Sequence, residues 1–323
     1  MTPGELITIE EFMRRALHDP RRGYYARRIH GIGRRGDFTT APMIGGSLAR
    51  AVAGWAAAAL RETGCRDLVE IGPGEGVLAA AVWKHLPWSL RWTTRLHLVE
   101  SSVALRGVQQ ARLGRRARWH GHPSAALAAC AGRAVVFSNE LVDAFPARVF
   151  EKSSTGWHEL GVVMDDAGRV AERLLESGGL PPSSSFDVDH PPGQRVEVHD
   201  SYRRWLGEWL PDWRAGRMLT IDYGNHAGAL YHRRPRGTLR GYLLQQRLDG
   251  PAIYQNPGRQ DLTADVNFTD LIAWSGKRAR TRCLQTMGDF IKDCVTDDDA
   301  AILTDPAGAG GAFLVLDQEC TPD

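Results

Sequence analysis

A glycine turn between an apolar run and a helical run constrains this chain more than any other sequence feature. Residues 67–71 (Asp-Leu-Val-Glu-Ile) predict a buried strand, and residues 77–83 predict a helix. Between them, residues 70–76 are Glu-Ile-Gly-Pro-Gly-Glu-Gly. A strand, a glycine turn and a helix bring backbone N–H groups and the positive end of a helix dipole to one point. That point suits the carboxylate or phosphate of a nucleotide-like ligand.

A second acid follows at the end of the next predicted strand. Residues 96–100 (Leu-His-Leu-Val-Glu) form an apolar run that ends at Glu100. A carboxylate in this position can accept hydrogen bonds from both hydroxyls of a ribose. The two strands with their turns therefore predict half of a nucleotide-binding α/β domain.

The glycine spacing distinguishes three interpretations of the turn. The dinucleotide fingerprint is Gly-x-Gly-x-x-Gly, whereas Gly72, Gly74 and Gly76 are separated by single residues. Glu70 would crowd a pyrophosphate, but it suits the ammonium group of a methionine-type ligand. The pattern resembles motif I of class I S-adenosylmethionine (SAM) methyltransferases. A dinucleotide site and a purely structural turn remain the alternatives.

Composition limits the other classes of function. The formal net charge of +2 argues for no nucleic-acid partner. No stretch approaches the roughly 18 consecutive apolar residues that span a bilayer, so we expect no membrane partner. The five cysteines show no Cys-x-x-Cys spacing, which suits reduced thiols. Because Glu5, Glu10 and Glu11 interrupt the acid-poor pattern of a transit peptide, we expect a cytoplasmic location.

Strands and helices alternate through the middle of the chain. Predicted strands at 67–71, 95–100, 117–120 and 134–138 alternate with helices at 77–86 and 103–113. This order predicts an α/β fold with a mostly parallel, doubly wound, Rossmann-like sheet. From Ala147 the period changes: a hairpin around 153–156 and a helix over 202–210 precede further strands at 218–224 and 312–316.

This pattern divides the chain into four expected regions. Residues 1–62 form an N-terminal helical cap or lid, and residues 63–146 form the first half of the SAM-binding core. Residues 147–215 are an inserted hairpin and helix. Residues 216–323 form the second half of the core, with an excursion on the substrate side at 225–270.

An ordered set of motifs resembles one family over nearly the whole chain. The motifs are Ile9-Glu10-Glu11-Phe12-Met13, Gly23-Tyr24-Tyr25, Gly36-Asp37-Phe38-Thr39-Thr40, residues 70–76, Leu98-Val99-Glu100-Ser101-Ser102, Ser138-Asn139-Glu140-Leu141 with Asp143-Ala144 and Pro146, Ile221-Asp222-Tyr223-Gly224, Gly237-Thr238-Leu239-Arg240, Pro257-Gly258 with Gln260-Asp261-Leu262-Thr263, and Val266-Asn267-Phe268-Thr269. They resemble the MidA-like family of SAM-dependent methyltransferases. Its mitochondrial members are complex I assembly factors that methylate arginine on a complex I subunit.

The resemblance implies SAM as cofactor and a protein arginine as methyl acceptor. Three positions depart from the family pattern: Gln245 and Asp265 stand where histidines are expected, and Thr40-Ala41-Pro42-Met43 replaces Ser-Pro-Glu-Ile. These changes fall in the part that should contact substrate. They keep two alternatives open, a SAM methyltransferase of a small molecule and a SAM-binding assembly chaperone without turnover.

The candidate cofactor residues belong to the first half of the core. Gly72, Gly74 and Gly76 would permit close backbone approach to the methionine portion, and Glu70 would order that portion or cap the turn. Glu100 would hold the ribose. Trp119 would stack beside adenine or pack in the core. Pro73, Ser101 and Asn139 complete the predicted cofactor site.

The candidate catalytic residues are carboxylates, because the guanidinium of an acceptor arginine stays charged at physiological pH. Glu140 and Asp143 follow the fourth strand, three residues apart at an expected helix start, where they can face the same way. Capping of that helix is the alternative role for Asp143. Asp37 and Asp222 are second-line candidates. His120-Gly121-His122 lacks further ligands at useful spacing, so we expect no metal site.

Overall fold

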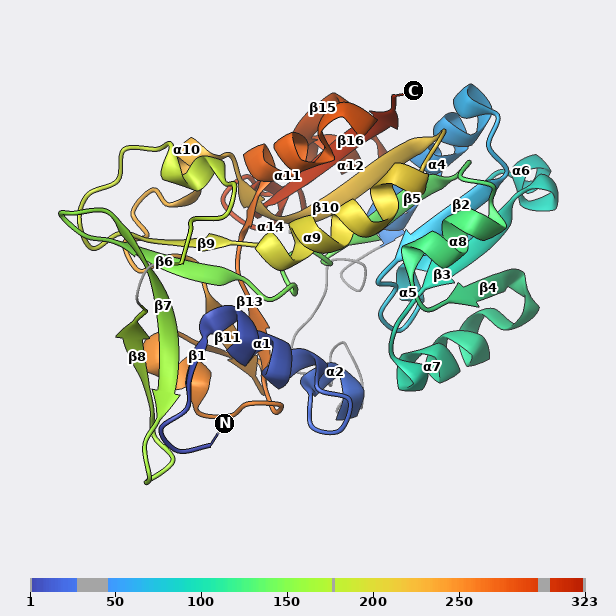
Figure 1. Ribbon diagram of the computed structural model, residues 1–323. Helices are drawn as coiled ribbons and strands as arrows, with labels where there is room; N and C mark the ends of the chain where they lie inside the picture. Colours follow the sequence, from blue (N-terminus) through green and yellow to red (C-terminus); the bar gives the residue numbers. More distant parts are fainter. Residues whose placement is uncertain (1, 28–45, 176–177, 296–302, 322–323) are drawn as a thin grey trace.

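The computed structural model describes residues 2–27, 46–175, 178–295 and 303–321. Its largest sheet has the strand order β15-β16-β10-β5-β2-β3-β4 (Figure 1). The short strand β14 pairs with β10. The strands of this sheet are β2 (Asp67–Ile71), β3 (Arg95–Val99), β4 (Ala117–His120), β5 (Val135–Asn139), β10 (Arg217–Asn225), β14 (Val266–Asn267), β15 (Ala279–Thr286) and β16 (Phe313–Cys320).

The sheet is mixed, with a parallel centre. Strands β4, β3, β2, β5 and β10 pair in parallel, whereas β16 runs antiparallel to both of its neighbours, β10 and β15. The expected doubly wound α/β fold is confirmed. The chain leaves β2 toward β3 and β4 and returns with β5 on the other side of β2. In such sheets ligands bind beyond the carboxyl ends of the strands at the point of reversal, here between β2 and β5.

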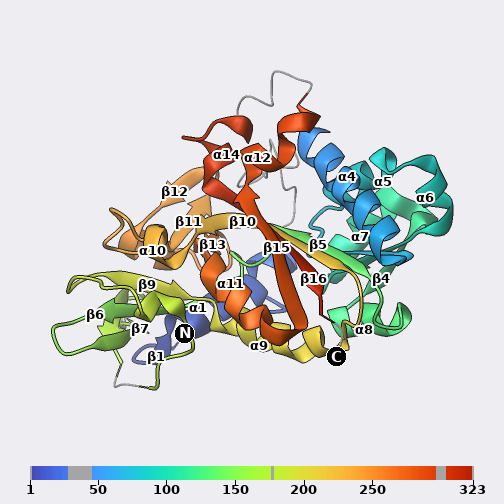
Figure 2. The same ribbon diagram turned by 90° about the horizontal axis from the view of Figure 1, so that it is seen from above.

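Helices cover both faces of this sheet (Figure 2). On one face lie α4 (Gly46–Thr63), α5 (Val77–His85), α12 (Met287–Ile291) and α14 (Ala309–Ala312), and on the other lie α8 (Pro123–Ala129), α9 (Asp200–Trp209) and α11 (Phe268–Ser275). The connections after β2 and β3 also contain α6 (Trp88–Thr93) and α7 (Val103–Leu113). Side chains alternate along each strand, so Leu68 and Phe137 face the α4 side while Val69 and Val136 face the α9 side.

Helix α4 is part of this core. Its apolar face, including Leu48, Val52, Ala56 and Leu60, is almost wholly buried in the same cluster as Leu68 of β2. The sequence division placed residues up to 62 in an N-terminal cap. The structure instead places α4 in the core of the largest sheet, because small alanine side chains let the helix pack closely against its neighbours.

The N-terminus joins a second sheet, built mostly from the 147–215 region. Its order is β1-β7-β6-β9, with β8 paired to β7. The strands are β1 (Leu6–Thr8), β6 (Arg148–Lys152), β7 (Trp157–Met164), β8 (Val170–Leu174) and β9 (Arg195–Val198). The predicted hairpin is confirmed as the antiparallel pair β6–β7. Strands β1, β8 and β9 are short and were not expected from the sequence.

Two N-terminal helices pack against this second sheet. Helix α1 (Ile9–His18) begins after Thr8, whose hydroxyl accepts a 3.1 Å hydrogen bond from the N–H of Glu11. Its residues Ile9, Phe12 and Leu17 share a core with Val149 and Val162 of the sheet. A short helix, α2 (Tyr24–Arg27), follows.

Among the described residues, none of the helices has the length and apolar character needed to cross a membrane.

The excursion at 225–270 forms a small third sheet in the order β12-β11-β13. Its elements are α10 (Ala227–Leu230), β11 (Arg240–Leu243), β12 (Gln246–Leu248) and β13 (Asp261–Thr263). Short 3-10 helices complete the described structure: η1 (Gly114–Arg116), η2 (Ser184–Phe186), η3 (Leu210–Asp212), η4 (Gly250–Tyr254), η5 (Gly276–Arg278) and η6 (Lys292–Cys294).

Candidate active site

A cavity of about 280 Å³ lies beyond the carboxyl ends of β2 and β5, where the strand order predicts a ligand site. Segments from six parts of the chain line it: α1 with α2, the turn after β2, the end of β3 with the start of α7, the start of α8, the turn after β5, and α9. The lining residues are His18, Tyr25, Glu70, Ile71, Gly72, Pro73, Gly74, Glu75, Val77, Leu78, Val99, Glu100, Ser101, Leu105, Gly121, Pro123, Asn139, Glu140, Leu141, Ala144, Phe145 and Trp205.

The glycine turn presents its backbone to this cavity. Gly72 and Gly74 have φ values of 67° and 52°, in the left-handed region where a side chain is strained. A Cβ on Gly72 would also lie 2.7 Å from Cδ1 of Leu141. The N–H of Gly72 donates to the carbonyl of Val99 over 3.0 Å, which ties the turn to the end of β3. The turn thus has a conformation that favours glycine and is anchored to β3, which leaves its backbone open to close approach of a ligand.

Glu70 is a buried acid with an unused oxygen. The residue is 2% exposed, and its Oε2 atom has no hydrogen-bond partner among the described residues. Burial raises the pKa of Glu70 to about 8. A buried carboxyl group without a partner is costly unless a ligand supplies a cation or a donor. The ammonium group of a methionine moiety would do so, and Glu70 therefore fits SAM.

Glu100 also lines the cavity and is 8% exposed. Its Oε1 accepts a 2.8 Å hydrogen bond from the N–H of Ser102, which holds the carboxylate at the end of β3. Burial raises the pKa of Glu100, and the hydrogen bond from Ser102 opposes that shift. The position is the one predicted for a ribose-binding acid.

Gln109 of α7 links these two halves of the site and was not among the predicted site residues. Its side-chain amide donates to the carbonyl of Gly74 over 2.7 Å and toward Oε2 of Glu100 over 3.4 Å. Its carbonyl accepts a 2.9 Å hydrogen bond from the indole N–H of Trp119. Trp119 is not among the residues that line the cavity, so the structure favours its packing role over adenine stacking. The sequence signal that could have identified Gln109 is a polar residue on the buried face of an amphipathic helix.

Aromatic side chains from distant segments close the cavity, and none of them was among the predicted site residues. His18 and Tyr25 stack with ring centroids 5.5 Å apart, and the Tyr25 hydroxyl donates to Asp261 over 3.0 Å. On another wall, the ring centroids of Phe145 and Trp205 lie 5.1 Å apart. Gly23-Tyr24-Tyr25 was part of the family resemblance, but no local pattern places α9 at the cavity.

Glu140 is the predicted catalytic acid that reaches the cavity. Its φ of 50° lies in the left-handed region, and its N–H donates to the carbonyl of Ile221 over 2.9 Å. Oε1 accepts from the amide of Asn139 over 3.0 Å, and Oε2 accepts from the hydroxyl of Tyr223 over 3.3 Å. Neighbouring strands thus fix the backbone and carboxylate of Glu140.

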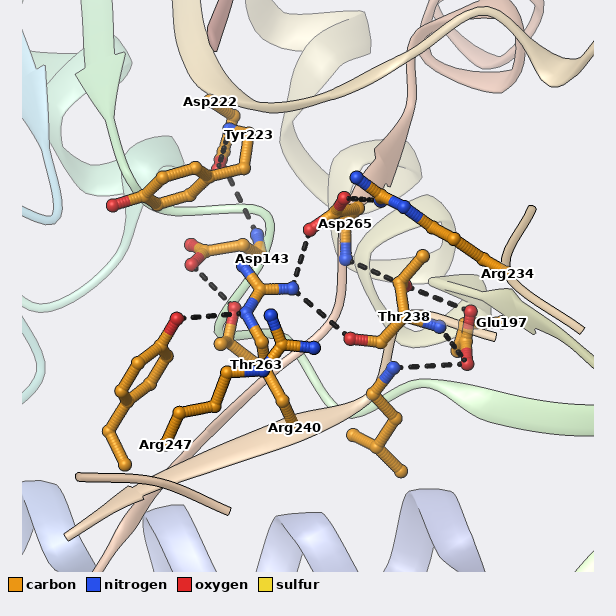
Figure 3. A network of polar contacts seen from close by, with 12 residues as sticks. Asp143, Glu197, Asp222, Tyr223, Arg234, Thr238, Arg240, Arg247, Thr263 and Asp265 are labelled. Atoms are coloured by element: carbon orange, nitrogen blue, oxygen red, sulfur yellow. Dashed lines mark hydrogen bonds and ion pairs between the residues drawn. The ribbon is translucent and has the colours of Figure 1, made fainter. Parts of the chain in front are cut away.

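Asp143 and Asp222 lie behind the cavity wall. Asp222 is fully buried, and its Oδ2 accepts hydrogen bonds of 3.2, 2.8 and 3.4 Å from the N–H groups of Leu141, Val142 and Asp143. It holds the turn after β5 in place of the helix expected there. Asp143 accepts a 2.7 Å hydrogen bond from the hydroxyl of Thr263 (Figure 3). Neither acid lines the cavity. Asp37 lies outside the described residues.

Burial raises the pKa of both acids. For Asp222 the neighbouring charge of Asp143 adds to the effect of burial, whereas for Asp143 the hydrogen bond from Thr263 opposes it. Two carboxyl groups this close and this deeply buried do not ionise independently. Neither acid lines the cavity, and their hydrogen bonds to Val142 and Thr263 hold its wall.

Two of the three departures from the family pattern, Asp265 and Gln245, have different surroundings, and the third, at residues 40–43, lies outside the described residues. Asp265 is 8% exposed and forms ion pairs with Arg240 over 2.5 Å and with Arg234 (Figure 3). A carboxylate at this position is therefore matched by two cations. Gln245 lies in the turn between β11 and β12 with a φ of 65°. Neither residue lines the cavity.

One buried cluster has metal-ligand chemistry and was not foreseen. Ligand atoms of Asp67, His97 and Cys130 lie within 4.8 Å of one another. Arg95 already binds Asp67 with two hydrogen bonds of 2.7 and 2.6 Å, and His97 bonds both Asp67 and His120 over 2.9 Å. Because the guanidinium of Arg95 already pairs with Asp67, the only carboxylate of this cluster, it would repel a metal cation. The side chains therefore form a hydrogen-bonded chain rather than a metal site.

Comparisons with known proteins agree with this geometry. The model of the S-adenosyl-L-methionine-dependent methyltransferase family matches residues 51–286. Mitochondrial protein arginine methyltransferase NDUFAF7 of Rattus norvegicus is 27% identical over 333 residues, covering 94% of this chain and 74% of the relative. The Danio rerio protein of that name is 27% identical over 328 residues, covering 92% and 75%.

A solved structure with the same fold contains a ligand derived from SAM. A Burkholderia thailandensis protein, crystallised with S-adenosyl-homocysteine (SAH), superposes with a TM-score of 0.82 at 27% identity, covering 98% of this chain and 88% of that one. The cofactor predicted from the glycine turn and Glu100 is therefore SAM. The chain belongs to the family of S-adenosyl-L-methionine-dependent methyltransferases.

Proposed function

We propose that this methyltransferase transfers methyl groups from SAM to arginine side chains of a protein. The observation that carries the proposal is the Glu140 carboxylate, which two hydrogen bonds hold at the cavity beyond β5. The relatives named as protein arginine methyltransferases support the same acceptor. Their names also place those proteins in mitochondria, whereas a cytoplasmic location for this chain stays a prediction.

The cofactor supplies an electrophilic methyl group on a sulfonium, so the protein needs chiefly to position the nucleophile and exclude water. Glu70 would hold the cofactor's ammonium and Glu100 its ribose hydroxyls. The glycine turn would allow the methionine portion to approach backbone closely. Phe145 and Trp205 would keep water from one wall of the cavity.

Glu140 would act on the acceptor. A guanidinium spreads its electrons over three nitrogens and is a poor nucleophile while charged. A carboxylate that binds it through two N–H groups orients one terminal nitrogen toward the methyl group. As that nitrogen gains the methyl group it loses a proton, which an oxygen of Glu140 can accept. The product is then a methylated guanidinium with its charge unchanged.

Glu140→Gln tests this role with little change of shape. SAH affinity should stay within about twofold, while transfer to arginine should fall about 100-fold or more, because the carboxylate positions and deprotonates the nucleophile. Tritiated methyl transfer from SAM into protein of a lysate from cells lacking this chain measures the rate. Amino-acid analysis of the labelled protein identifies methylarginine.

Glu319→Gln is the matched control, since Glu319 lies on β16 at the opposite end of the sheet from the cavity. Its rate should equal that of the wild type. Full activity of Glu140→Gln would contradict the role of Glu140, and label on a residue other than arginine would contradict the acceptor. Label confined to small molecules would favour the small-molecule alternative.

A further inference from the structure

Tyr223 lies between the cavity acid Glu140 and a buried cation, Arg240. Its hydroxyl donates to Oε2 of Glu140 over 3.3 Å, while Cζ of Arg240 lies 5.6 Å from the centroid of its ring. The ring also contacts Phe313, with centroids 3.8 Å apart. A cation beside an aromatic ring is attracted to it. The ring is thus held by Arg240 and Phe313 while its hydroxyl reaches the acid.

Arg240 is itself rigidly held (Figure 3). It is 7% exposed, and its guanidinium donates to Asp265 over 2.5 Å, to the carbonyl of Thr238 over 3.1 Å and to the hydroxyl of Tyr242 over 3.1 Å. The N–H of Asp265 donates to the hydroxyl of Thr238 over 3.0 Å, which closes the network. Each partner fixes the others, so Arg240 has little freedom to leave the Tyr223 ring.

The charge of Arg240 has a consequence for a cationic acceptor. A guanidinium of the protein near Glu140 would compete with the acceptor's own guanidinium for the carboxylate. Asp265 weakens that competition, because its carboxylate pairs with Arg240 as well as with the half-exposed Arg234. The Tyr223 ring lies between Arg240 and Glu140. Burial of an arginine is tolerated only when it is paired in this way. The Arg240–Asp265 pair thus holds the Tyr223 ring while the Asp265 carboxylate offsets the positive charge of Arg240 near the cavity.

We infer that Tyr223 is a positioning residue, which holds the Glu140 carboxylate toward the acceptor, and that the Arg240–Asp265 pair keeps the Tyr223 ring in place. This rests on the proposed function insofar as Glu140 binds the acceptor. The left-handed backbone of Glu140 makes such support necessary, since a residue at a φ of 50° leaves that conformation unless its surroundings hold it.

Tyr223→Phe removes the hydroxyl and keeps the ring. The rate of label transfer at saturating SAM should fall about tenfold, the lower end expected for a lost hydrogen bond to a charged group. The KM for SAM and the dissociation constant for SAH should stay at their wild-type values. A general loss of structure would change both. In a Glu140→Gln background the same substitution should cause no further loss, because the group it positions is gone.

Tyr254→Phe is the matched control. The Tyr254 hydroxyl also donates to a glutamate, Glu172, over 2.8 Å, but neither residue lines the cavity. This variant should retain the wild-type rate. Arg240→Lys and Arg240→Met provide a second comparison: the lysine variant keeps a cation beside Asp265 and should be more active than the methionine variant.

The outcomes separate the two proposals. A slow Glu140→Gln enzyme with a wild-type rate for Tyr223→Phe would overturn the role of Tyr223 alone. Additive losses in the Tyr223→Phe, Glu140→Gln double variant would overturn it too, and equal rates for the two Arg240 variants would overturn the role of the ion pair. Full activity of Glu140→Gln would instead overturn the proposed function on which the inference rests.

Discussion

The side-chain amide of Gln109 donates a 2.7 Å hydrogen bond to the backbone carbonyl of Gly74. Gln109 is fully buried, and the same side chain accepts from Trp119 and reaches Glu100. One residue of α7 therefore connects the glycine turn, the acid at the end of β3 and the tryptophan of β4. The two halves of the cofactor site are joined through a side chain rather than by backbone pairing alone.

Replacing this side chain should weaken cofactor binding. Gln109→Leu preserves much of the volume but leaves the carbonyl of Gly74 and the indole N–H of Trp119 without a partner. The loss should raise the dissociation constant for SAH about tenfold, in the range expected for unsatisfied buried groups. Calorimetric titration measures it. Gln110→Leu, on the exposed side of α7, should bind as the wild type does, and equal affinities for both variants would show that Gln109 does not support the turn.

The glycine turn should not accept a side chain. Gly74→Val places a β-branched residue at a φ of 52° on the wall of the cavity, where it would block the backbone from the ligand. SAH binding should be lost. Gly64→Val controls for backbone strain, since Gly64 has a φ of 65° with no atom within 4 Å of a built Cβ. A folded Gly74→Val protein with wild-type affinity would contradict the assignment of the turn.

Cofactor binding should be linked to a proton at Glu70. The pKa of this acid is raised to about 8, so it is mostly protonated in the free protein at pH 7. An ammonium group beside it favours the ionised form, and binding should release a proton. SAH affinity should therefore rise as the pH increases from 6.5 toward 8, by up to about tenfold per pH unit. Titration calorimetry in buffers of different ionisation enthalpy counts the proton. Glu70→Gln should abolish the release, and an unchanged count would place the linkage elsewhere.

His199 should make the fold sensitive to mild acid. Burial lowers the pKa of this histidine to about 4, below its ordinary value of 6.5. The unfolded chain therefore binds a proton below pH 6.5 that the folded chain does not, and stability is lost as the pH falls. Lowering the pH from 7.5 to 5.5 should therefore reduce the free energy of unfolding by about 1.4 kcal/mol. Urea unfolding at both pH values measures it. His199→Gln should lose less stability over this interval, whereas the exposed His226→Gln should behave as the wild type, and identical pH dependence in all three would exclude His199 as the cause.

The sequence alone determined the half of the site that local constraints specify. Gly72, Gly74 and Gly76 with Glu70 indicated a turn only glycine can form, and the alternation of strands placed Glu100 beside it. These features are local, since a turn needs particular φ values and a buried parallel strand needs a continuous apolar run. The same reasoning recovered the parallel centre of the sheet and the β6–β7 hairpin.

Only the tertiary structure decided which polar groups meet across long distances in the chain. Tyr25 bonds Asp261 across 236 positions, and Asp222 bonds the turn at Leu141 across 81. Asp143, Asp222 and Glu140 look alike in the sequence, yet only Glu140 reaches the cavity. Apolar periodicity specifies which face of an element is buried but not which partner covers it, because burial lowers the free energy whatever apolar surface supplies it. Hydrogen bonds and ion pairs require one geometry, and that geometry exists only once the sheets and helices have packed together.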